Sequence, residues 1–225
     1  MKYSIGRLAF MPVLLSALLL PGPALAAEAP ATPAEWSAAV RKTYAEYRSM
    51  GAEFDQVFVR GESGITEERQ GRFLFQKPLR VRWSTDAPFE ELLIVTDDLI
   101  WQYDAFEEIA YKAPIEALDD KNAFLQVLFG LSSLQDTFKI TIQPDRSGDD
   151  GLAHLLLEPY EPASSLMLAE IWLEPKTALI RRIEIKDAFG NLNRVSLKKI
   201  DKNPRVPAEA FTFTPPPGVE VEDRT

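Results

Sequence analysis

The sequence predicts a mainly antiparallel β fold of the α+β class, in which a curled sheet or incomplete, half-open β-barrel is covered by helices. About ten short segments alternate apolar and polar residues, and turn residues such as Pro, Gly and Asp separate them. Only two stretches carry apolar residues at helical spacing. Sequential strands at this spacing favour a large antiparallel sheet, whose concave face the two helices would cover as a lid.

The N-terminal residues indicate export. A short basic start precedes an apolar run over residues 8–20, and small residues at 24–26 supply a cleavage site. The run is too short to span a bilayer. We therefore expect residues 1–26 to be a signal peptide cleaved after Ala26, and residues 27–225 to form one domain in the bacterial periplasm. No cysteine stands near the cleavage site to carry a lipid.

The first helix is expected over residues 32–51. Thr32 is a capping residue, Pro33 suits the first helical position and Glu35 completes a capping box. Residues 60–71 are polar and are expected to form a hairpin loop. A second helix is expected over residues 114–133. Strands are expected at 54–59, 72–76, 79–83, 91–96, 100–104, 138–142, 152–158, 168–174, 179–185 and 193–200, with a short strand in the C-terminal tail.

The charge balance excludes one class of partner. Removing the two basic residues of the signal peptide leaves 23 basic and 34 acidic residues, a net charge of −11. Nucleic-acid binding depends on neutralising phosphates with basic side chains, so a nucleic-acid partner is not expected. The same charge disfavours residence on an anionic membrane surface.

The residues that enzymes use for catalysis are scarce. The chain has one histidine and no cysteine, and it lacks both a Gly-x-Ser-x-Gly elbow and a glycine-rich phosphate loop. His154 lies in an apolar strand pattern, which predicts a structural residue. Residues 145–151 depart from a calcium-binding loop at two positions and are expected to form a hairpin loop. We therefore predict a protein that is not an enzyme and has neither a cofactor nor a metal site.

Large apolar side chains instead concentrate in residues 71–104. Strand parity places Phe73 with Phe75 and Val81 with Trp83, whereas residues 92–95 have no polar face. Two interpretations remain open on parity alone. The apolar face is either the filled core beneath two helices or the wall of a hollow that holds an apolar ligand.

Short motifs spread over nearly the whole mature chain occur in a defined order. Each is weak alone, but their order and spacing together are specific. They are "FDQV" (54–57), "GRF" (71–73), "KP" (77–78), "RW" (82–83), "IVTDDLIWQYD" (94–104), "LEPK" (173–176) and "FTFTPPPGVEVED" (211–223).

In this order the motifs resemble the periplasmic outer-membrane lipoprotein carrier family (LolA). The resemblance implies a half-open barrel with a helical lid over a hydrophobic cavity. It implies a monomeric chaperone that takes triacylated lipoproteins from an inner-membrane ABC exporter, shields their acyl chains and passes them to an outer-membrane receptor lipoprotein. A carrier of another lipid and a ligand-free interaction module are the alternatives.

The resemblance also implies a lid lock, because the family's arginine before proline is thought to hydrogen-bond the lid's backbone. That position is Lys77 here, and Arg80 is a second candidate. A lysine offers three donors on a flexible stem rather than a planar fork of five. Asp98 stands in place of the family's turn glycine. The residues expected to line the acyl cavity are Phe73, Phe75, Val81, Trp83, Ile94, Trp101 and Tyr103 on the sheet, with Leu125 and Leu128 on the lid.

Overall fold

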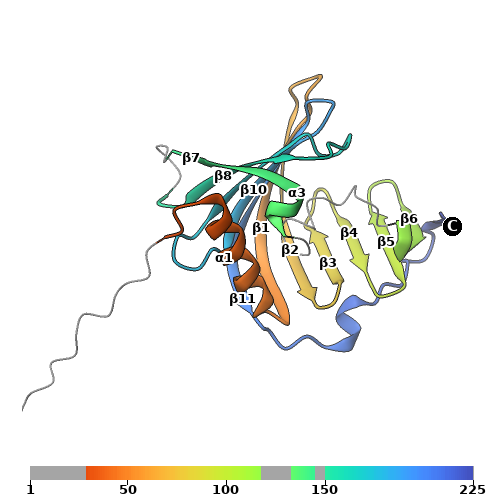
Figure 1. Cartoon of the computed structure of the whole chain (residues 1–225). Helices are drawn as coiled ribbons and strands as arrows, with labels where there is room; N and C mark the ends of the chain where they lie inside the picture. The colour runs from red at the N-terminus through yellow and green to blue at the C-terminus, as the bar shows by residue number, and fades with distance from the viewer. Residues whose placement is uncertain (1–28, 118–132, 145–149, 225) are drawn as a thin grey trace, which may run out of the picture.

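The computed structural model describes residues 29–117, 133–144 and 150–224. Within these residues twelve strands form one open sheet in the order β12-β6-β5-β4-β3-β2-β1-β11-β10-β9-β8-β7, which curls around helix α1 (Figure 1). All neighbours are antiparallel except β12 and β6, which are parallel. The strands are β1 (Ser49–Val59), β2 (Thr66–Gln76), β3 (Arg80–Thr85), β4 (Glu91–Val95), β5 (Leu99–Asp104), β6 (Ile109–Pro114), β7 (Phe138–Gln143), β8 (Ala153–Pro159), β9 (Leu168–Leu173), β10 (Ile180–Lys186), β11 (Leu192–Lys202) and β12 (Glu220–Asp223).

Helix α1 (Pro33–Ala45) begins where the sequence predicts. The Thr32 side chain accepts a hydrogen bond from the backbone N–H of Glu35, whose carboxylate accepts from the backbone of Thr32, so the capping box is confirmed. The predicted end at residue 51 is wrong. The segment from Ser49 onward pairs with both β2 and β11, and this two-sided ladder prevails over the helical spacing of the apolar residues.

Two strand predictions also need correction. The second half of the expected polar loop over residues 60–71 is strand, because β2 starts at Thr66 and pairs with β1 along its whole length. Strand β6 was not predicted, since its small residues Ala110 and Ala113 give a weak alternation. The remaining short helices in the described residues are α3 (Leu134–Thr137) and the 3-10 turns η1 (Ile115–Ala117) and η3 (Ala208–Phe211).

The sheet has an inner face, which carries Phe54 and Phe73 and packs against α1, and an outer face. α1 lies within the concave side in Figure 1, and α3 contacts it through a hydrogen bond from the Gln135 N–H to Ser37 Oγ (3.2 Å). The inner face and α1 share one hydrophobic core, to which α1 contributes Trp36, Val40 and Tyr44. Its buried sheet residues include Met50, Phe75, Val81, Val95, Leu155, Leu157, Ile171, Leu173, Ile183, Val195 and Leu197.

The C-terminal segment crosses the outer face of the β3–β6 half of the sheet. Arg82 donates a hydrogen bond to the carbonyl oxygen of Ala210 (3.3 Å), and Phe211 is buried. Phe213 packs on the rings of Trp101 and Tyr103, with centroids 5.5 and 5.4 Å away. The outer face of this half of the sheet is therefore covered, and Ile94 of the apolar run at residues 92–95 is fully buried.

Some predictions fall outside the described residues. They are the signal peptide of residues 1–26 with its cleavage site, most of the second helix expected over 114–133, including Leu125 and Leu128, and residues 145–149 of the hairpin loop expected over 145–151. Residues 114–117 are described and form the end of β6 and η1 rather than an α-helix. In the part of the chain that the structure describes, no helix has both the length and the apolar character needed to cross a bilayer.

Candidate functional site

An aromatic and aliphatic floor forms on the inner face of β2 and β3. The ladder sets Phe73 opposite Trp83 and Phe75 opposite Val81, so these four predicted residues lie together on one face. Phe73 and Trp83 are stacked with their centroids 5.7 Å apart, at 8° between planes. Phe54 of β1 also stacks on Trp83, with the two ring centroids 4.1 Å apart.

Gly71 creates the space for this stack. It faces Phe54 across the β1–β2 ladder, and the Phe54 ring lies over it. A Cβ atom added at Gly71 would lie 2.6 Å from Phe54 Cζ and would collide with the backbone oxygen of Ser84. A glycine therefore lets an aromatic ring from the neighbouring strand lie flat against the sheet and reach Trp83.

The prediction that Ile94, Trp101 and Tyr103 line the same cavity is wrong. Val81 pairs with Val95 and Trp83 with Leu93, which puts Ile94 on the opposite face of β4. Ile94 in turn pairs with Trp101, and Leu92 with Tyr103. These side chains therefore lie on the outer face, where the C-terminal segment covers them.

The inner-face residues that sequence reasoning missed are Leu93, Val95, Ile100 and Phe54. Leu93 and Val95 belong to an unbroken apolar run, so parity within that run could not tell the two faces apart. Their register with Val81 and Trp83 decides the face. Phe54 carried a usable signal, because it alternates with Asp55 at the start of the predicted strand.

Helix α1 is held against the concave side of the sheet by its apolar face and by one buried phenol. Trp36, Val40 and Tyr44 are almost fully buried. The Tyr44 hydroxyl accepts a hydrogen bond from the backbone N–H of Ile180 (3.3 Å), and burial raises the pKa of Tyr44. The hydroxyl therefore stays neutral and ties the helix to the first residue of β10.

Lys77 and Arg80, the two predicted lock residues, reach different partners. Lys77 Nζ donates to the backbone oxygens of Tyr44 (2.8 Å) and Ala45 (3.0 Å), at the C-terminal end of α1. A cation is favoured there because the last helical carbonyls carry partial negative charge. Arg80 instead pairs with Asp97, and this contact lowers the pKa of the Asp97 carboxyl. Lys77 alone of the two contacts the helix.

His154 and Asp98 were also singled out from the sequence, and both lie in the described residues. His154 lies within β8, as expected; its Nε2 is 2.6 Å from Glu170 Oε2 and its ring stacks on Trp172. Asp98 lies in the β4–β5 turn, where Thr96 Oγ1 accepts from the backbone N–H of Leu99 (3.0 Å). The φ angle of Asp98 is not positive, so this turn does not require the glycine that Asp98 replaces.

Residues 45–214 match the family model described as "Outer membrane lipoprotein carrier protein LolA". An outer-membrane lipoprotein carrier protein of Bordetella avium is 34% identical over 79% of this chain and 82% of its own. One from Bordetella pertussis is 31% identical over 75% and 77%, respectively. An uncharacterized conserved protein from Thermus thermophilus has a similar fold, with a TM-score of 0.55 at 12% identity, covering 85% of this chain and 98% of the other.

Proposed function

The chain belongs to the LolA family of outer membrane lipoprotein carrier proteins, and from this premise we propose that it shuttles lipoproteins across the periplasm. In this proposal an inner-membrane ABC exporter releases a triacylated lipoprotein to the carrier. The carrier shields the acyl chains on its inner face and passes them to an outer-membrane receptor. The family is one of carriers rather than enzymes.

The observation that carries the proposal is the aromatic floor beneath α1. An acyl chain of ~16 carbons gains about 0.8 kcal/mol for each buried CH₂ group, roughly 12 kcal/mol for the chain. Phe54, Phe73, Phe75 and Val81 of the floor are almost fully buried and Trp83 is partly buried, so their apolar surface becomes available to an acyl chain when α1 moves aside. Burial of acyl chains there supplies the affinity that a carrier needs.

For the carrier to release its cargo, part of the free energy gained by burying the acyl chains must be offset. α1 buries Trp36, Val40 and Tyr44 on the concave side of the sheet. Moving the helix aside exposes these side chains, so cargo binding is opposed by the loss of the helix's own contacts. The net affinity is then modest, and the cargo can pass to a receptor that binds it more tightly.

In the proposed mechanism, Lys77 helps to hold α1 in the closed position and so opposes cargo binding. Its ammonium group joins the β2–β3 turn to the C-terminal carbonyls of α1, and these two hydrogen bonds exist only while the helix is seated. The lysine thus stabilises the closed state over the open one. Arg80 has no part in this proposal, since its guanidinium is engaged by Asp97.

The test is a two-step transfer assay. Spheroplasts that make a tagged lipoprotein are incubated with and without the purified mature protein, and released lipoprotein is counted in the supernatant. The loaded carrier is then mixed with outer-membrane vesicles. Release that depends on this protein, followed by transfer to the vesicles, supports the proposal. If the folded carrier releases no lipoprotein from the spheroplasts, the proposed carrier function is wrong.

The competing functions give different results in a related measurement. A carrier of another amphiphile would co-purify with a non-lipoprotein lipid, which mass spectrometry of an organic extract would identify. A ligand-free interaction module would yield no lipid and would not take up an acylated probe.

A further inference from the structure

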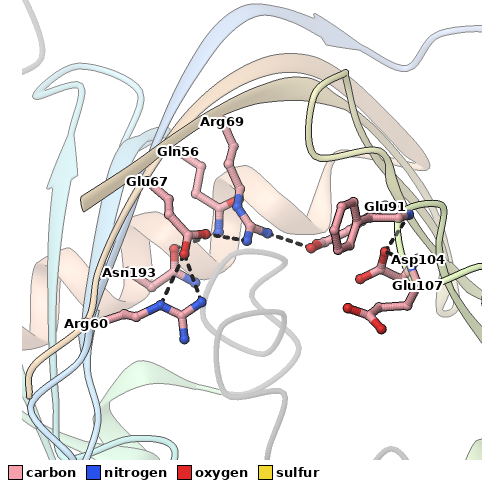
Figure 2. Close-up of polar contacts among 9 residues, drawn as sticks. Gln56, Arg60, Glu67, Arg69, Glu91, Asp104, Glu107 and Asn193 are labelled. Carbon is pink, nitrogen blue, oxygen red and sulfur yellow. Dashed lines mark hydrogen bonds and ion pairs between the residues drawn. The ribbon is translucent and has the colours of Figure 1, made fainter. Parts of the chain in front are cut away.

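A charged cluster occupies the end of the inner face that is farthest from Lys77. It consists of Gln56, Arg60, Glu67, Arg69, Glu91, Asp104 and Asn193. Gln56 faces Arg69 across the β1–β2 ladder, one inward position beyond the Phe54–Gly71 pair. Figure 2 shows these side chains projecting to the same side of the sheet. The cluster therefore borders the aromatic floor directly.

Arg69 is the centre of the cluster. Its two terminal nitrogens bind Glu67 Oε2 at 2.7 Å and Glu91 Oε1 at 2.8 Å, as Figure 2 shows. Arg60 holds the other oxygen of Glu67 at 2.8 Å. The Arg69 guanidinium also lies over the Phe89 ring, 5.1 Å from its centre. These contacts fix the plane of the guanidinium and leave its third nitrogen as the free donor position.

That third nitrogen, Arg69 Nε, is buried and has no hydrogen-bond partner among the described residues. The side chain as a whole is only 17% exposed. A buried N–H without an acceptor costs free energy comparable to a lost hydrogen bond. A ligand that brings an acceptor to this point would therefore bind with the donor already oriented.

Stability alone is a poor explanation for these charges. Their neighbours along the same inward rows are Phe54, Phe73 and Trp83, and an apolar pair at the position of a buried ion pair is often equally stable or more so. The arrangement does have a selective consequence. Glu67, Glu91 and Asp104 outnumber Arg60 and Arg69, so an anionic ligand would meet net repulsion.

We propose that the Arg69 cluster binds the uncharged carbonyl oxygen that joins an acyl chain to the rest of the cargo. This proposal rests on the carrier function proposed above. The chain lies on the aromatic floor, and its first carbonyl, in an ester or amide bond, accepts from Arg69 Nε at the polar end of that floor. The cluster thereby selects esterified or amide-linked chains over free fatty acids, whose carboxylates the three acidic residues repel.

The experiment measures three ligands on the folded mature protein. Diphenylhexatriene, a fluorescent hydrocarbon without a carbonyl, reports the apolar floor by itself. A synthetic lipopeptide with three palmitoyl chains and an uncharged peptide, and separately palmitic acid, compete with the dye. Arg69→Leu removes the donor, and Arg69→Lys keeps a positive charge for Glu67 and Glu91 but has no Nε–H. Arg72→Leu, on the outer face of the same strand, is the matched control.

Both Arg69 variants are expected to bind the lipopeptide about tenfold more weakly, the loss expected for a hydrogen bond to a charged group. Their affinities for the hydrocarbon and for palmitic acid should change less than twofold, and Arg72→Leu should match the wild type throughout. Circular dichroism and thermal unfolding establish that each variant is folded. A lipopeptide analogue with ether in place of ester links identifies which carbonyl binds Arg69. If the affinity of this analogue no longer depends on Arg69, the ester carbonyl is the acceptor. If its affinity still depends on Arg69, the amide carbonyl is the acceptor.

Unchanged lipopeptide affinity in folded Arg69→Lys and Arg69→Leu proteins would overturn the carbonyl site and leave the carrier function standing. An equal loss for palmitic acid would overturn the selection for uncharged carbonyls. Failure of the wild-type protein to bind either the hydrocarbon or the lipopeptide would instead overturn the proposed function itself.

Discussion

Lys77 Nζ lies 2.8 Å from the backbone oxygen of Tyr44, so a lysine at the end of β2 contacts the last turn of the helix that covers the aromatic floor. The contact joins two segments that are 33 positions apart in the sequence. Because it forms only when α1 is seated, its strength changes the balance between closed and open states without altering the floor that cargo would touch.

Replacing Lys77 by leucine is expected to make the carrier hold cargo too well. A cation at a helix C-terminus contributes about 1 kcal/mol, so the loss should raise lipoprotein affinity about fivefold by weakening the closed state. Transfer to outer-membrane vesicles should slow correspondingly. Pulse-chase transfer of a tagged lipoprotein measures both effects.

Two controls define the result for Lys77. Lys77→Arg should retain the contact, because arginine also donates to helix carbonyls. Arg80→Leu loses only a surface pair with Asp97 and should transfer at the wild-type rate. A normal transfer rate for Lys77→Leu would remove this lysine from the mechanism.

Trp83 and Trp101 test which face of the sheet carries cargo. Trp83→Ala removes the ring that stacks on Phe54 and Phe73, so it should abolish diphenylhexatriene binding and lower the free energy of unfolding by about 3 kcal/mol. Trp101→Ala loses packing against Phe213 on the outer face and should leave dye affinity unchanged. Equal loss of binding in the two variants would contradict this assignment of faces.

Gly71 is expected to tolerate no larger residue. Gly71→Ala places a methyl group against the Phe54 ring and the Ser84 backbone, and overpacking of this kind costs about 1–3 kcal/mol. Gly51→Ala on the adjacent strand is the matched control, since its nearest contact would be an ordinary 3.7 Å. Urea unfolding of both variants measures the difference, and similar midpoints would argue against the close packing at Gly71.

The Glu67 carboxylate should make stability depend on pH in the acid range. Its hydrogen bonds with Arg69 and then Arg60 lower the pKa of Glu67 below its ordinary value of 4.5. The folded state therefore gains stability above pH 4.5 and loses that gain as the pH falls through the lowered pKa. Urea midpoints from pH 7 to pH 3 should fall less steeply for Glu67→Gln, and identical slopes would count against the pairing.

The sequence was most informative where local chemistry decides the structure. The start of α1 follows from Thr32, Pro33 and Glu35, whose contacts are all within four residues. Strand alternation predicted most of the sheet. It failed at residues 66–71, where a polar strand is formed because β1 provides a partner for it, and at β6, where small residues weaken the pattern.

Half of the candidate site depended on information that a single sequence does not contain. Sequence alternation could place four residues on one face, because each alternates with polar residues or lies in a strand of clear parity. They are Phe73, Phe75, Val81 and Trp83. Ile94 could not be assigned to a face, because every residue from 92 to 95 is apolar and only the pairing with β3 orients them. Arg69 carried no signal, since the polar tract around it is typical of an exposed loop.

The parallel pairing of β12 with β6 protects one margin of the open sheet from aggregation. Without it, β6 would present unpaired N–H and C=O groups to any other chain with an extended segment. β12 is short and exposed, and its Glu220, Glu222 and Asp223 add negative charge along the new margin. The C-terminal strand β12 thus discourages strand exchange between copies of the chain at this margin of the open sheet.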